Sequence, residues 1–342
     1  MTSEGSLRVM ADRQPNPSGE DSLIARYFRP LATDPGAFNL DDDAAVLKAA
    51  GDDIVVTTDA IVEGVHFLPD DPPDTIARKA LRANLSDLAA KGAAPAGFVL
   101  TLALRSADDA WLAPFMQALG EDAAQFGCPL LGGDTVSTPG PLMISITAFG
   151  RAAPGKIVHR SGAKPGDRVV VSGTIGDAAL GLDVLKGGAV AAALVSDAAA
   201  RARLADRYRV PQPRNALANA VCDHASAAMD VSDGLAGDLA KLCAASGISA
   251  AIDAASIPFS PAAIELLARH VVGIEALIAG GDDYEILCAI PEDRLEAFAL
   301  AAGQAGVAVT LIGTMMAGSA APVFLGKDGK ELQLERLSYS HF

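Results

Sequence analysis

Apolar residues in the first half of the chain recur with the periods of strands and helices. Runs of apolar or β-branched residues predict strands at 54–58, 97–104 and 142–150. Helices are expected over 74–90, with Asp74 as the N-cap, and over 107–126. The apolar face of the first of these helices consists of Ile76, Ala80, Leu81, Leu85 and Leu88.

The second half of the chain repeats this mixture. Apolar runs predict strands at 168–173, 227–231, 285–290 and 307–313. Helices are expected from about Gly176, before the strand at 227, from Asp233, and between the last two strands, whereas a less regular stretch leads to Pro211. Both halves therefore predict an α/β (α+β) fold.

A junction between two domains is expected at 151–167, which is rich in glycine, proline and basic residues. A chain of 342 residues is also long for a single hydrophobic core. A short helix that begins at Ser18 or Asp21 and carries the apolar residues of 22–28 should open the first domain. We predict a flexible tail over 1–17, an N-terminal domain over 18–152 and a C-terminal domain over 153–342.

Composition and charge restrict the class of protein. The net charge of −15 and an aromatic fraction of 5% argue against a nucleic-acid partner, which needs basic surface and stacking side chains. Four cysteines without a CxxC pair exclude a zinc ribbon and give no disulfide framework. No long apolar run and no basic-then-apolar leader are present, so we expect a soluble, cytoplasmic protein without a membrane partner.

Five short acidic segments, each at the end of an apolar run, are the most informative feature of the chain. They lie at 41–47, 54–60, 84–90, 130–135 and 229–239. None contains a lysine or arginine, and aspartate is rarely buried unless it is paired or bound to a metal. Carboxylates gathered without cations predict divalent metal ions, and such hard oxygen ligands suit magnesium shared with phosphates. Each segment alone also fits a helix cap or a turn.

Two of these segments resemble ligand-binding turns. Leu130 and Leu131 are expected to end a strand, so that the following glycines let the backbone approach a ligand and Asp134 lies at the tip. Asp230 lies inside an apolar run, where a helix cap cannot explain it, whereas Asp233 has the position of an N-cap.

Other motifs carry weaker signals. The segment 150–157 matches G-x-x-x-x-G-K, but Ile157 replaces the hydroxyl that a P-loop needs. The segment 172–182 fits either a phosphate site at a helix start or a structural glycine turn. His66 and the acidic pair in 279–288 are compatible with structural or functional roles. No nucleophile elbow G-x-S-x-G is present, which disfavours hydrolysis through a covalent serine.

Taken together, these segments resemble the thiamine-monophosphate kinase family of the aminoimidazole-ribonucleotide-synthetase-like superfamily. The match runs from about residue 20 to the C-terminus. It rests on SLIARYF, DDAAVL, TTDAIVEGVHF, ANLSDLAAKGAAP, LLGGDT, HRSGAKPGD, SGTIGDAALGL, MDVSDGLAGDL, GGDDYEI and the terminal HF. Of these, DAIVEGVHF, RSGAKPGD and the ending are the most specific to the kinase.

The resemblance implies transfer of the ATP γ-phosphoryl group to thiamine monophosphate, with several magnesium ions per active site. It also implies a two-domain fold of this superfamily, with the N-terminal domain forming the interface of a homodimer. By the same resemblance, magnesium would be held by Asp43, Thr57, Thr58, Asp59, Asp87, Asp134, Asp230 and Asp233. ATP would contact Gly133, Asp134, Arg160 and Ser232, and thiamine monophosphate would contact His66 and Asp282.

No general base or covalent residue is expected, because a phosphate monoester that accepts the group is already anionic at neutral pH. Two positions depart from the family pattern: Asp41 replaces a frequent glycine, and Asp282 replaces a glutamate expected to touch the thiamine. Aminoimidazole-ribonucleotide synthetase is the nearest enzymatic alternative. A metal-dependent nucleotide sensor without turnover is the non-enzymatic one.

Overall fold

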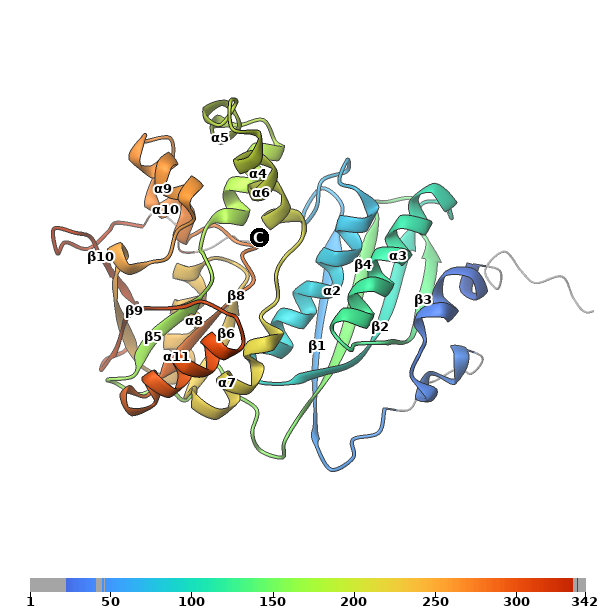
Figure 1. Ribbon diagram of the computed structural model, residues 1–342, viewed down its shortest axis with the longest axis horizontal. Coiled ribbons are helices and arrows are strands. Elements are labelled where there is room, and N and C mark those ends of the chain that lie inside the picture. Colours follow the sequence, from blue (N-terminus) through green and yellow to red (C-terminus); the bar gives the residue numbers. More distant parts are fainter. Residues whose placement is uncertain (1–22, 41–44, 46, 335–336, 338–342) are drawn as a thin grey trace, which may run out of the picture.

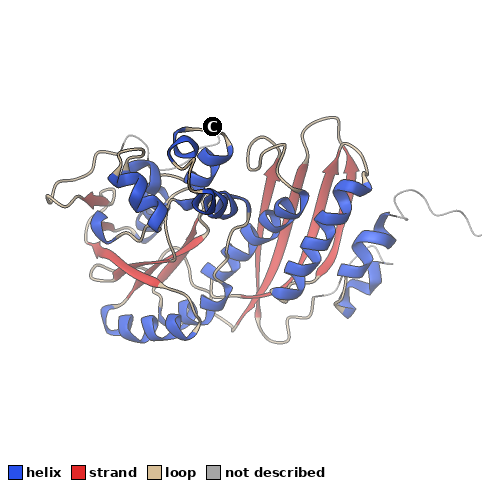
Figure 2. Ribbon diagram, turned by 45° about the horizontal axis from the view of Figure 1, so that its top comes forward, coloured by secondary structure: helices blue, strands red, loops and turns tan. Residues whose placement is uncertain are grey.

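The computed structural model describes residues 23–40, 45, 47–334 and 337. Two sheets lie side by side, each with its own helices, and they correspond to the two halves of the sequence (Figures 1 and 2). The expected α/β (α+β) class with two sheet-containing halves is confirmed. Asp41, Asp43 and the predicted tail over 1–17 lie outside the described residues.

The N-terminal sheet has the order β1-β4-β2-β3. Its strands are β1 (Asp53–Val62), β2 (Ala94–Leu104), β3 (Leu130–Ser137) and β4 (Met143–Ala152). Strand β4 is antiparallel to both β1 and β2, whereas β3 is parallel to β2 and forms an edge. Alternate residues of β4 are buried, as the two-residue period of a strand with one covered face requires.

Helices α2 (Pro73–Ala90) and α3 (Asp109–Gln125) cover one face of this sheet (Figures 1 and 2). Helix α3 begins after Asp108, whose carboxylate accepts the Ala110 N–H, but α2 begins after Pro72. The predicted cap Asp74 is therefore wrong and lies in the first turn instead. The short turns before β1 are η1 (Ile24–Phe28), η2 (Arg29–Leu31) and η3 (Pro35–Leu40).

The C-terminal sheet has the order β10-β7-β9-β5-β8-β6. Its strands are β5 (Arg168–Ser172), β6 (Ala227–Val231), β7 (Ser249–Asp253), β8 (Glu285–Ile290), β9 (Val309–Met316) and β10 (Val323–Leu325). The helices are α4 (Asp177–Leu185), α5 (Ala189–Ala193), α6 (Ala198–Arg209), α7 (Ala218–His224), α8 (Leu235–Ser246), α9 (Pro261–Ala268), α10 (Ile274–Ile278) and α11 (Leu295–Gln304). Three short turns join them: η4 (Asn215–Leu217), η5 (Ala254–Ser256) and η6 (Glu292–Arg294).

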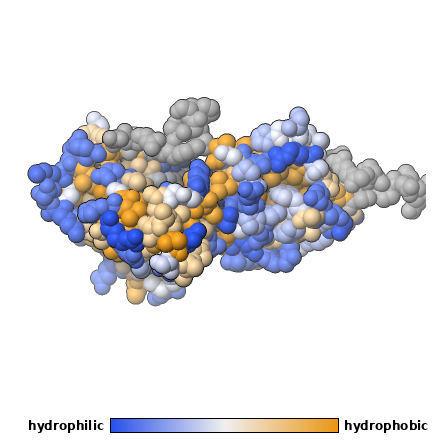
Figure 3. Space-filling model, turned by 90° about the horizontal axis from the view of Figure 1, so that it is seen from above, coloured by the Kyte–Doolittle hydropathy of each residue, from blue (hydrophilic) through white to orange (hydrophobic). Residues whose placement is uncertain are grey.

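Both faces of the C-terminal sheet are covered, and helix α2 of the N-terminal half takes part. Residues of α8 pack on one face, while α7, α11 and the last residues of α2, Ala89 and Ala90, belong to the core on the other. The preceding residues of α2 belong to the N-terminal core. Figure 3 shows apolar atoms gathered where the two halves meet. Helix α2 is thus shared by the cores of both halves.

Three local predictions are wrong. Strand β3 begins at Leu130 and continues through Asp134, which pairs with Thr101, so the leucines do not end a strand. The stretch before Pro211 contains α5 and α6, and the helix expected from Asp233 begins at Leu235. Strands β7 and β10 are short, and no apolar run in the sequence predicts them. Within the described part of the chain, no helix has the length and apolar character needed to cross a membrane.

A buried ion-pair network fixes α2 against α3 and supplies a test of the fold. Asp122, fully buried, accepts hydrogen bonds from Arg82 Nε at 2.6 Å and Arg82 Nη2 at 2.8 Å, and also pairs with Arg78. We predict that Asp122→Ala lowers the free energy of unfolding by about 3–5 kcal/mol, because it leaves the Arg82 guanidinium buried without a carboxylate.

Glu121→Ala is the matched control for urea unfolding, because Glu121 pairs with the same Arg78 but its side chain is 51% exposed. The Glu121→Ala variant should lose less than about 1 kcal/mol of unfolding free energy. Equal losses in the two variants would contradict the prediction.

Candidate active site

Strand β1 and helix α2 bring three of the predicted polar side chains together. Thr57 and Asp59 are two residues apart, so both point to the helix side of the sheet. The Thr57 hydroxyl donates to Asp87 Oδ2 at 2.5 Å, and Asp87 lies in the last turn of α2. Thr58 lies between them and faces the other side of the sheet, where its hydroxyl donates to the Ile146 carbonyl at 3.1 Å. Thr58 is therefore not part of this group.

The C-terminal half brings Asp230 to the same place. Asp230 is 6% exposed near the end of β6, and burial raises its pKa well above the ordinary range, with further contributions from Asp87 and Asp238. Burial also raises the pKa of Asp87, although the Thr57 hydroxyl and nearby cations lower it. Carboxylates from the two halves therefore repel one another across the boundary.

Asp59 extends this acidic surface into a pocket. Its side chain is exposed on the pocket side, yet the surrounding protein raises its pKa to about 6, mainly by desolvation, and repulsion from Asp87 and Asp233 adds to the effect. A cation placed among Asp59, Asp87 and Asp230 would stabilise their ionised forms.

Some of the counter-charge is internal, which corrects the expectation that it must all come from outside. Lys241 Nζ lies 2.5 Å from Asp233 Oδ2 and 2.9 Å from Asp238 Oδ1. Asp238 is buried and accepts the backbone N–H groups of Ser232 and Asp233, each at 3.0 Å. Asp233 is therefore paired with Lys241 of the following helix, α8.

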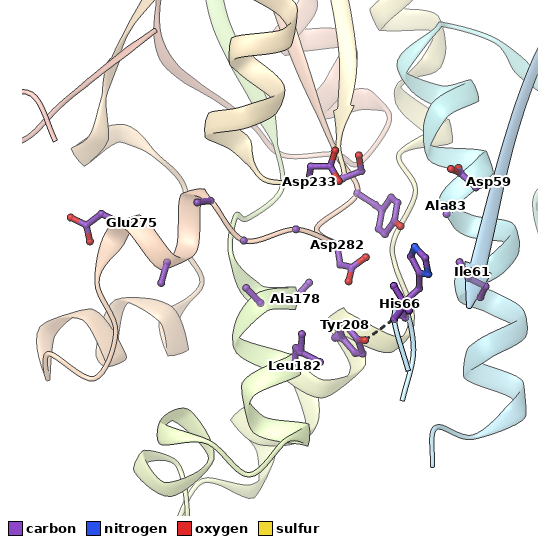
Figure 4. Close-up of a pocket in the computed structure, with 18 of the residues that line it drawn as sticks. Asp59, Ile61, His66, Ala83, Ala178, Leu182, Tyr208, Asp233, Glu275 and Asp282 are labelled. Carbon is purple, nitrogen blue, oxygen red and sulfur yellow. Dashed lines mark hydrogen bonds between the residues drawn. The ribbon is translucent and has the colours of Figure 1, made fainter. Parts of the chain in front are cut away.

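A pocket of about 950 Å³ lies between the two halves and collects five of the predicted site residues. Asp59 and His66 line it from the N-terminal half, and Ser232, Asp233 and Asp282 line it from the C-terminal half. Figure 4 shows His66 and Asp282 pointing toward the same space, with Asp59 and Asp233 nearby. Residues that are far apart in the sequence thus share one cavity.

Two buried side chains donate hydrogen bonds to the backbone of the loop that carries His66. The His66 carbonyl accepts from Lys79 Nζ at 2.8 Å and from the Tyr208 hydroxyl at 3.1 Å (Figure 4). The imidazole Nδ1 of His66 accepts a hydrogen bond from the Val62 N–H at 3.0 Å, so the neutral ring carries its proton on Nε2. Lys79 Nζ also lies 3.2 Å from Asp282 Oδ2.

The loop before β8 has an unusual backbone. Asp282 and Tyr284 have φ angles of 71° and 51°, a conformation that is strained for residues with a side chain. The Asp282 N–H donates to the Ser232 carbonyl at 2.7 Å, which joins the loop to the segment after β6. Asp283, fully buried between them, accepts the N–H groups of Gly176 at 2.6 Å and Ala178 at 3.2 Å at the start of α4.

A second pocket of about 240 Å³ lies beside Asp87. Thr57 and Asp87 line it together with three basic residues, Lys91, His159 and Arg160. Lys91 also crosses to the C-terminal half, where its Nζ donates to the Ala228 carbonyl at 2.8 Å. Arg160 is thus near Asp87, whereas Ser232, the other predicted nucleotide contact of the C-terminal half, lines the larger pocket.

Gly133 and Asp134 are not brought to these pockets. They lie on the edge strand β3, which β4 and β2 separate from β1. Asp134 shares a cross-strand row with Thr101 and Ser145 on the face without helices. Gly133 itself is required by close packing, since an added Cβ would lie 2.0 Å from the Leu100 carbonyl oxygen. Asp43 lies outside the described residues.

The carboxylates suit magnesium by their chemistry. Among the described residues, no group of three or more His, Cys, Asp or Glu side chains is compact enough to hold a metal by itself. Magnesium does not need such a group, because it keeps several waters and is bound through one or two carboxylates plus substrate phosphates. The mutual repulsion of Asp59, Asp87 and Asp230 is the feature that a divalent cation would relieve.

Comparisons with known proteins agree with this architecture. A family model described as AIR synthase related protein, N-terminal domain, matches residues 41–152, and its C-terminal counterpart matches residues 164–325. A thiamine-monophosphate kinase of Caulobacter vibrioides is 45% identical over 331 residues, which cover 95% of this chain and 91% of the relative. The chain belongs to the thiamine-monophosphate kinase family.

Solved structures of this kinase family have the same fold. A thiamine-monophosphate kinase from Stenotrophomonas maltophilia is 36% identical, with a TM-score of 0.78 over 89% of this chain and 94% of that one. A structure of AaThiL complexed with AMPPCP and TMP is 28% identical, with a TM-score of 0.73 over 88% of this chain and 91% of that one. The two-domain fold expected from the family resemblance is confirmed.

Several residues of this kinase-family site escape sequence reasoning. Lys79 stands on the apolar face of α2, where a lysine is unexpected, and this was the one signal that the sequence offered. Asp238 and Asp283 lie in acidic segments that the sequence analysis names, but their partners are backbone N–H groups that only the fold reveals. Tyr208 gives no signal, because its partner His66 is distant in the sequence. Lys91 lies just beyond the helix that carries Asp87, and only the folded chain reveals its neighbours.

The buried carboxyl of Asp283 predicts a pH dependence of stability in this kinase-family chain. Burial raises the pKa of Asp283 to about 8, although the Gly176 N–H, Arg207 and the Ala178 N–H lower it. Between roughly pH 4 and pH 8 the folded chain keeps a proton that the unfolded chain releases, so this group makes folding less favourable as the pH rises. Asp283→Asn cannot ionise and should lose this contribution.

Urea unfolding is measured from about pH 5 to about pH 8 for wild type and Asp283→Asn. The contributions of the other titrating groups largely cancel in the difference between the two free energies of unfolding. The unfolding free energy of wild type minus that of the variant should decrease as the pH rises. A constant or increasing difference would contradict the prediction.

Proposed function

We propose that this chain transfers the γ-phosphoryl group of ATP to thiamine monophosphate, giving thiamine diphosphate and ADP. The observation that carries the proposal is the shared pocket, in which His66 and Asp282 face the acidic residues Asp59 and Asp233. Family membership supports the same reaction. So does the AaThiL complex with AMPPCP and TMP, because AMPPCP is an ATP analogue with a carbon in place of a bridging oxygen.

Thiamine monophosphate would occupy the larger pocket. His66, which carries its proton on Nε2, would donate to the phosphate or the thiamine, and the Asp282 carboxylate would face the cationic thiazolium ring. The basic residues Lys91, His159 and Arg160 of the smaller pocket would face the phosphates of ATP. Asp59 lines the larger pocket and Asp87 the smaller one, and the two carboxylates are close enough to repel each other, so the group would be transferred between them.

The proposed transfer is direct and needs no general base. The phosphate of thiamine monophosphate carries roughly −1.5 to −2 charge at neutral pH and can attack without losing a proton. The difficulty is electrostatic, because two anionic groups must approach in line. The protein therefore has to orient the groups and offset their charge.

Magnesium ions held by Asp59, Asp87 and Asp230 would supply the positive charge that offsets both phosphates. Asp43, Asp134 and Asp233 stay predicted ligands, as do Thr57 and Thr58. The chain's own contribution is to hold Asp87 through the Thr57 hydroxyl and Asp230 through burial, so that both carboxylates face the boundary between the halves.

The decisive experiment is ADP release from ATP and magnesium, with and without thiamine monophosphate. Wild type should release ADP only with the acceptor. Asp87→Ala should lose about a hundredfold or more of kcat, because Asp87 is proposed to hold magnesium, and losing one interaction that stabilises developing charge has effects of this size. Asp74→Ala, at the other end of the same helix and outside both pockets, should keep wild-type activity.

Other outcomes would favour the alternatives. Turnover only with formylglycinamidine ribonucleotide would assign the chain to the aminoimidazole-ribonucleotide synthetase branch. ATP binding without turnover on either acceptor would indicate a nucleotide sensor.

We also propose that the chain forms a homodimer through the open face of the N-terminal sheet. Within the described residues no helix covers this face, where Val56 is 58% exposed and Val136 is 43% exposed. Asp134 lies on the same face. A second copy packed here would therefore approach Gly133 and Asp134, the two predicted nucleotide contacts that lie outside the pockets of a single chain.

Light scattering tests the dimer. Wild type should have about twice the mass of the 34.8 kDa chain, and Val56→Asp should shift it toward the monomer because a carboxylate would be buried without a partner. Val195→Asp is the control, since Val195 is 73% exposed in the C-terminal half. A monomeric wild type, or a dimer that survives Val56→Asp unchanged, would contradict the proposal.

A further inference from the structure

Lys79 is a buried lysine that the reaction scheme does not use. Its residue is 1% exposed, and it stands on helix α2 between Ile76 and Ala80, whose side chains belong to the N-terminal core. Lysine is almost never buried to this extent unless it is paired. Lys79 lies one helical turn before Ala83, which lines the larger pocket.

The ammonium of Lys79 contacts three groups from separate parts of the chain. Its Nζ donates to the His66 carbonyl at 2.8 Å, pairs with Asp282 Oδ2 at 3.2 Å, and lies 3.6 Å from the centre of the Tyr208 ring. Asp282 is 203 residues away in the sequence and belongs to the C-terminal half, as does Tyr208. One ammonium therefore contacts both halves of the molecule.

Each contact acts on the geometry of the pocket. Lys79 and the Tyr208 hydroxyl both donate hydrogen bonds to the His66 carbonyl, which fixes the backbone from which the His66 side chain extends. The Asp282 carboxylate is fixed although its backbone has the strained φ of 71°. His66 and Asp282 are the two residues proposed to contact thiamine monophosphate, and they come from opposite sides of the boundary (Figure 4).

Stability alone is a poor reason for a lysine at this position. Burying an ammonium is costly, and burial lowers the pKa of Lys79 even though Asp282 opposes the shift. Replacing a buried ion pair by apolar residues of similar volume is often neutral or stabilising. The directional contacts of an ammonium, which a methionine of similar length would lack, offer a better reason.

We propose that Lys79 is a positioning residue for thiamine monophosphate. Its ammonium fixes His66 of the N-terminal half and Asp282 of the C-terminal half relative to each other, so that both face one acceptor molecule. This inference rests on the proposed function, and it adds a residue that acts through others without touching the substrate.

The test compares Lys79→Met with wild type in the ADP-release assay. The KM for thiamine monophosphate should rise about tenfold or more, because hydrogen bonds to a charged group are lost from both contact residues. The KM for ATP should stay within about twofold, since Lys79 contacts His66, Asp282 and Tyr208 and none of the basic residues proposed to face the phosphates of ATP. Thermal unfolding should show a loss of no more than a few degrees, because Asp282, the partner left behind, has a side chain that is 28% exposed and can be solvated.

Arg209→Met is the matched control. Arg209 also pairs across the boundary, with its Nε 2.5 Å from Asp71 Oδ1, but neither residue lines the pocket. If the effect of Lys79→Met is only a looser boundary, Arg209→Met should raise the KM for thiamine monophosphate equally, which would overturn the proposal. The proposal expects the control to keep a wild-type KM.

A double-mutant cycle with Asp282→Asn tests the pairing itself. Lys79→Met should raise the KM for thiamine monophosphate less in the Asp282→Asn background than in wild type, because the two residues act as a unit. Independent, multiplicative effects would contradict the proposal, as would equal increases in both KM values. Lys79→Gln, which keeps an N–H donor without the charge, should give an intermediate KM, and it serves as the test if Lys79→Met does not fold.

The two proposals fail in different ways. A wild-type chain that releases no ADP with thiamine monophosphate would overturn the proposed function and the role of Lys79 with it. A wild-type chain with normal turnover and a Lys79→Met variant with an unchanged KM would overturn only the role of Lys79.

Discussion

The structure depends on the packing of helix α2 in two hydrophobic cores at once. Its first turns fill the N-terminal core, and Ala89 and Ala90 at its end fill the C-terminal core. A rigid helix cannot shift in one core without shifting in the other. Asp87, in the last turn, is therefore held at the boundary, where Asp230 approaches from β6 and Asp59 from β1. The geometry of the acidic site follows from apolar packing.

The same boundary collects the features that cost folding free energy. Carboxylates with raised pKa values, a buried lysine and two residues with positive φ all lie around the larger pocket. Such costs persist only where the surrounding structure compensates for them, and here the compensation comes from the well-packed apolar cores of the two halves. Unfavourable electrostatics in the ligand-free chain become favourable interactions when cations and anionic ligands are present together.

What the sequence predicts, and what it does not, follows from the range of the interactions. Helix α2 was predicted to within a residue because a 3.6-residue period is local, whereas β1 was predicted only over 54–58 and extends from Asp53 to Val62. The course of β3 was mispredicted because its glycines resemble a turn, whereas pairing with β2 extends it to Ser137. The motif resemblance names Asp59, His66, Ser232, Asp233 and Asp282 as site residues, but only the fold places them in one pocket. The roles of Lys79 and Asp283 could not be predicted, because both depend on contacts between distant segments.

The departure at Asp282 takes on a different meaning beside Lys79. The glutamate expected from the family resemblance has one more methylene group and would extend further into the pocket. Asp282 holds its carboxylate 3.2 Å from Lys79 Nζ, with a side chain that is 28% exposed. A side chain this short cannot keep that contact and also extend as far as a glutamate. The shorter side chain at residue 282 therefore keeps its carboxylate beside Lys79, at a wall of the pocket to which both halves of the chain contribute.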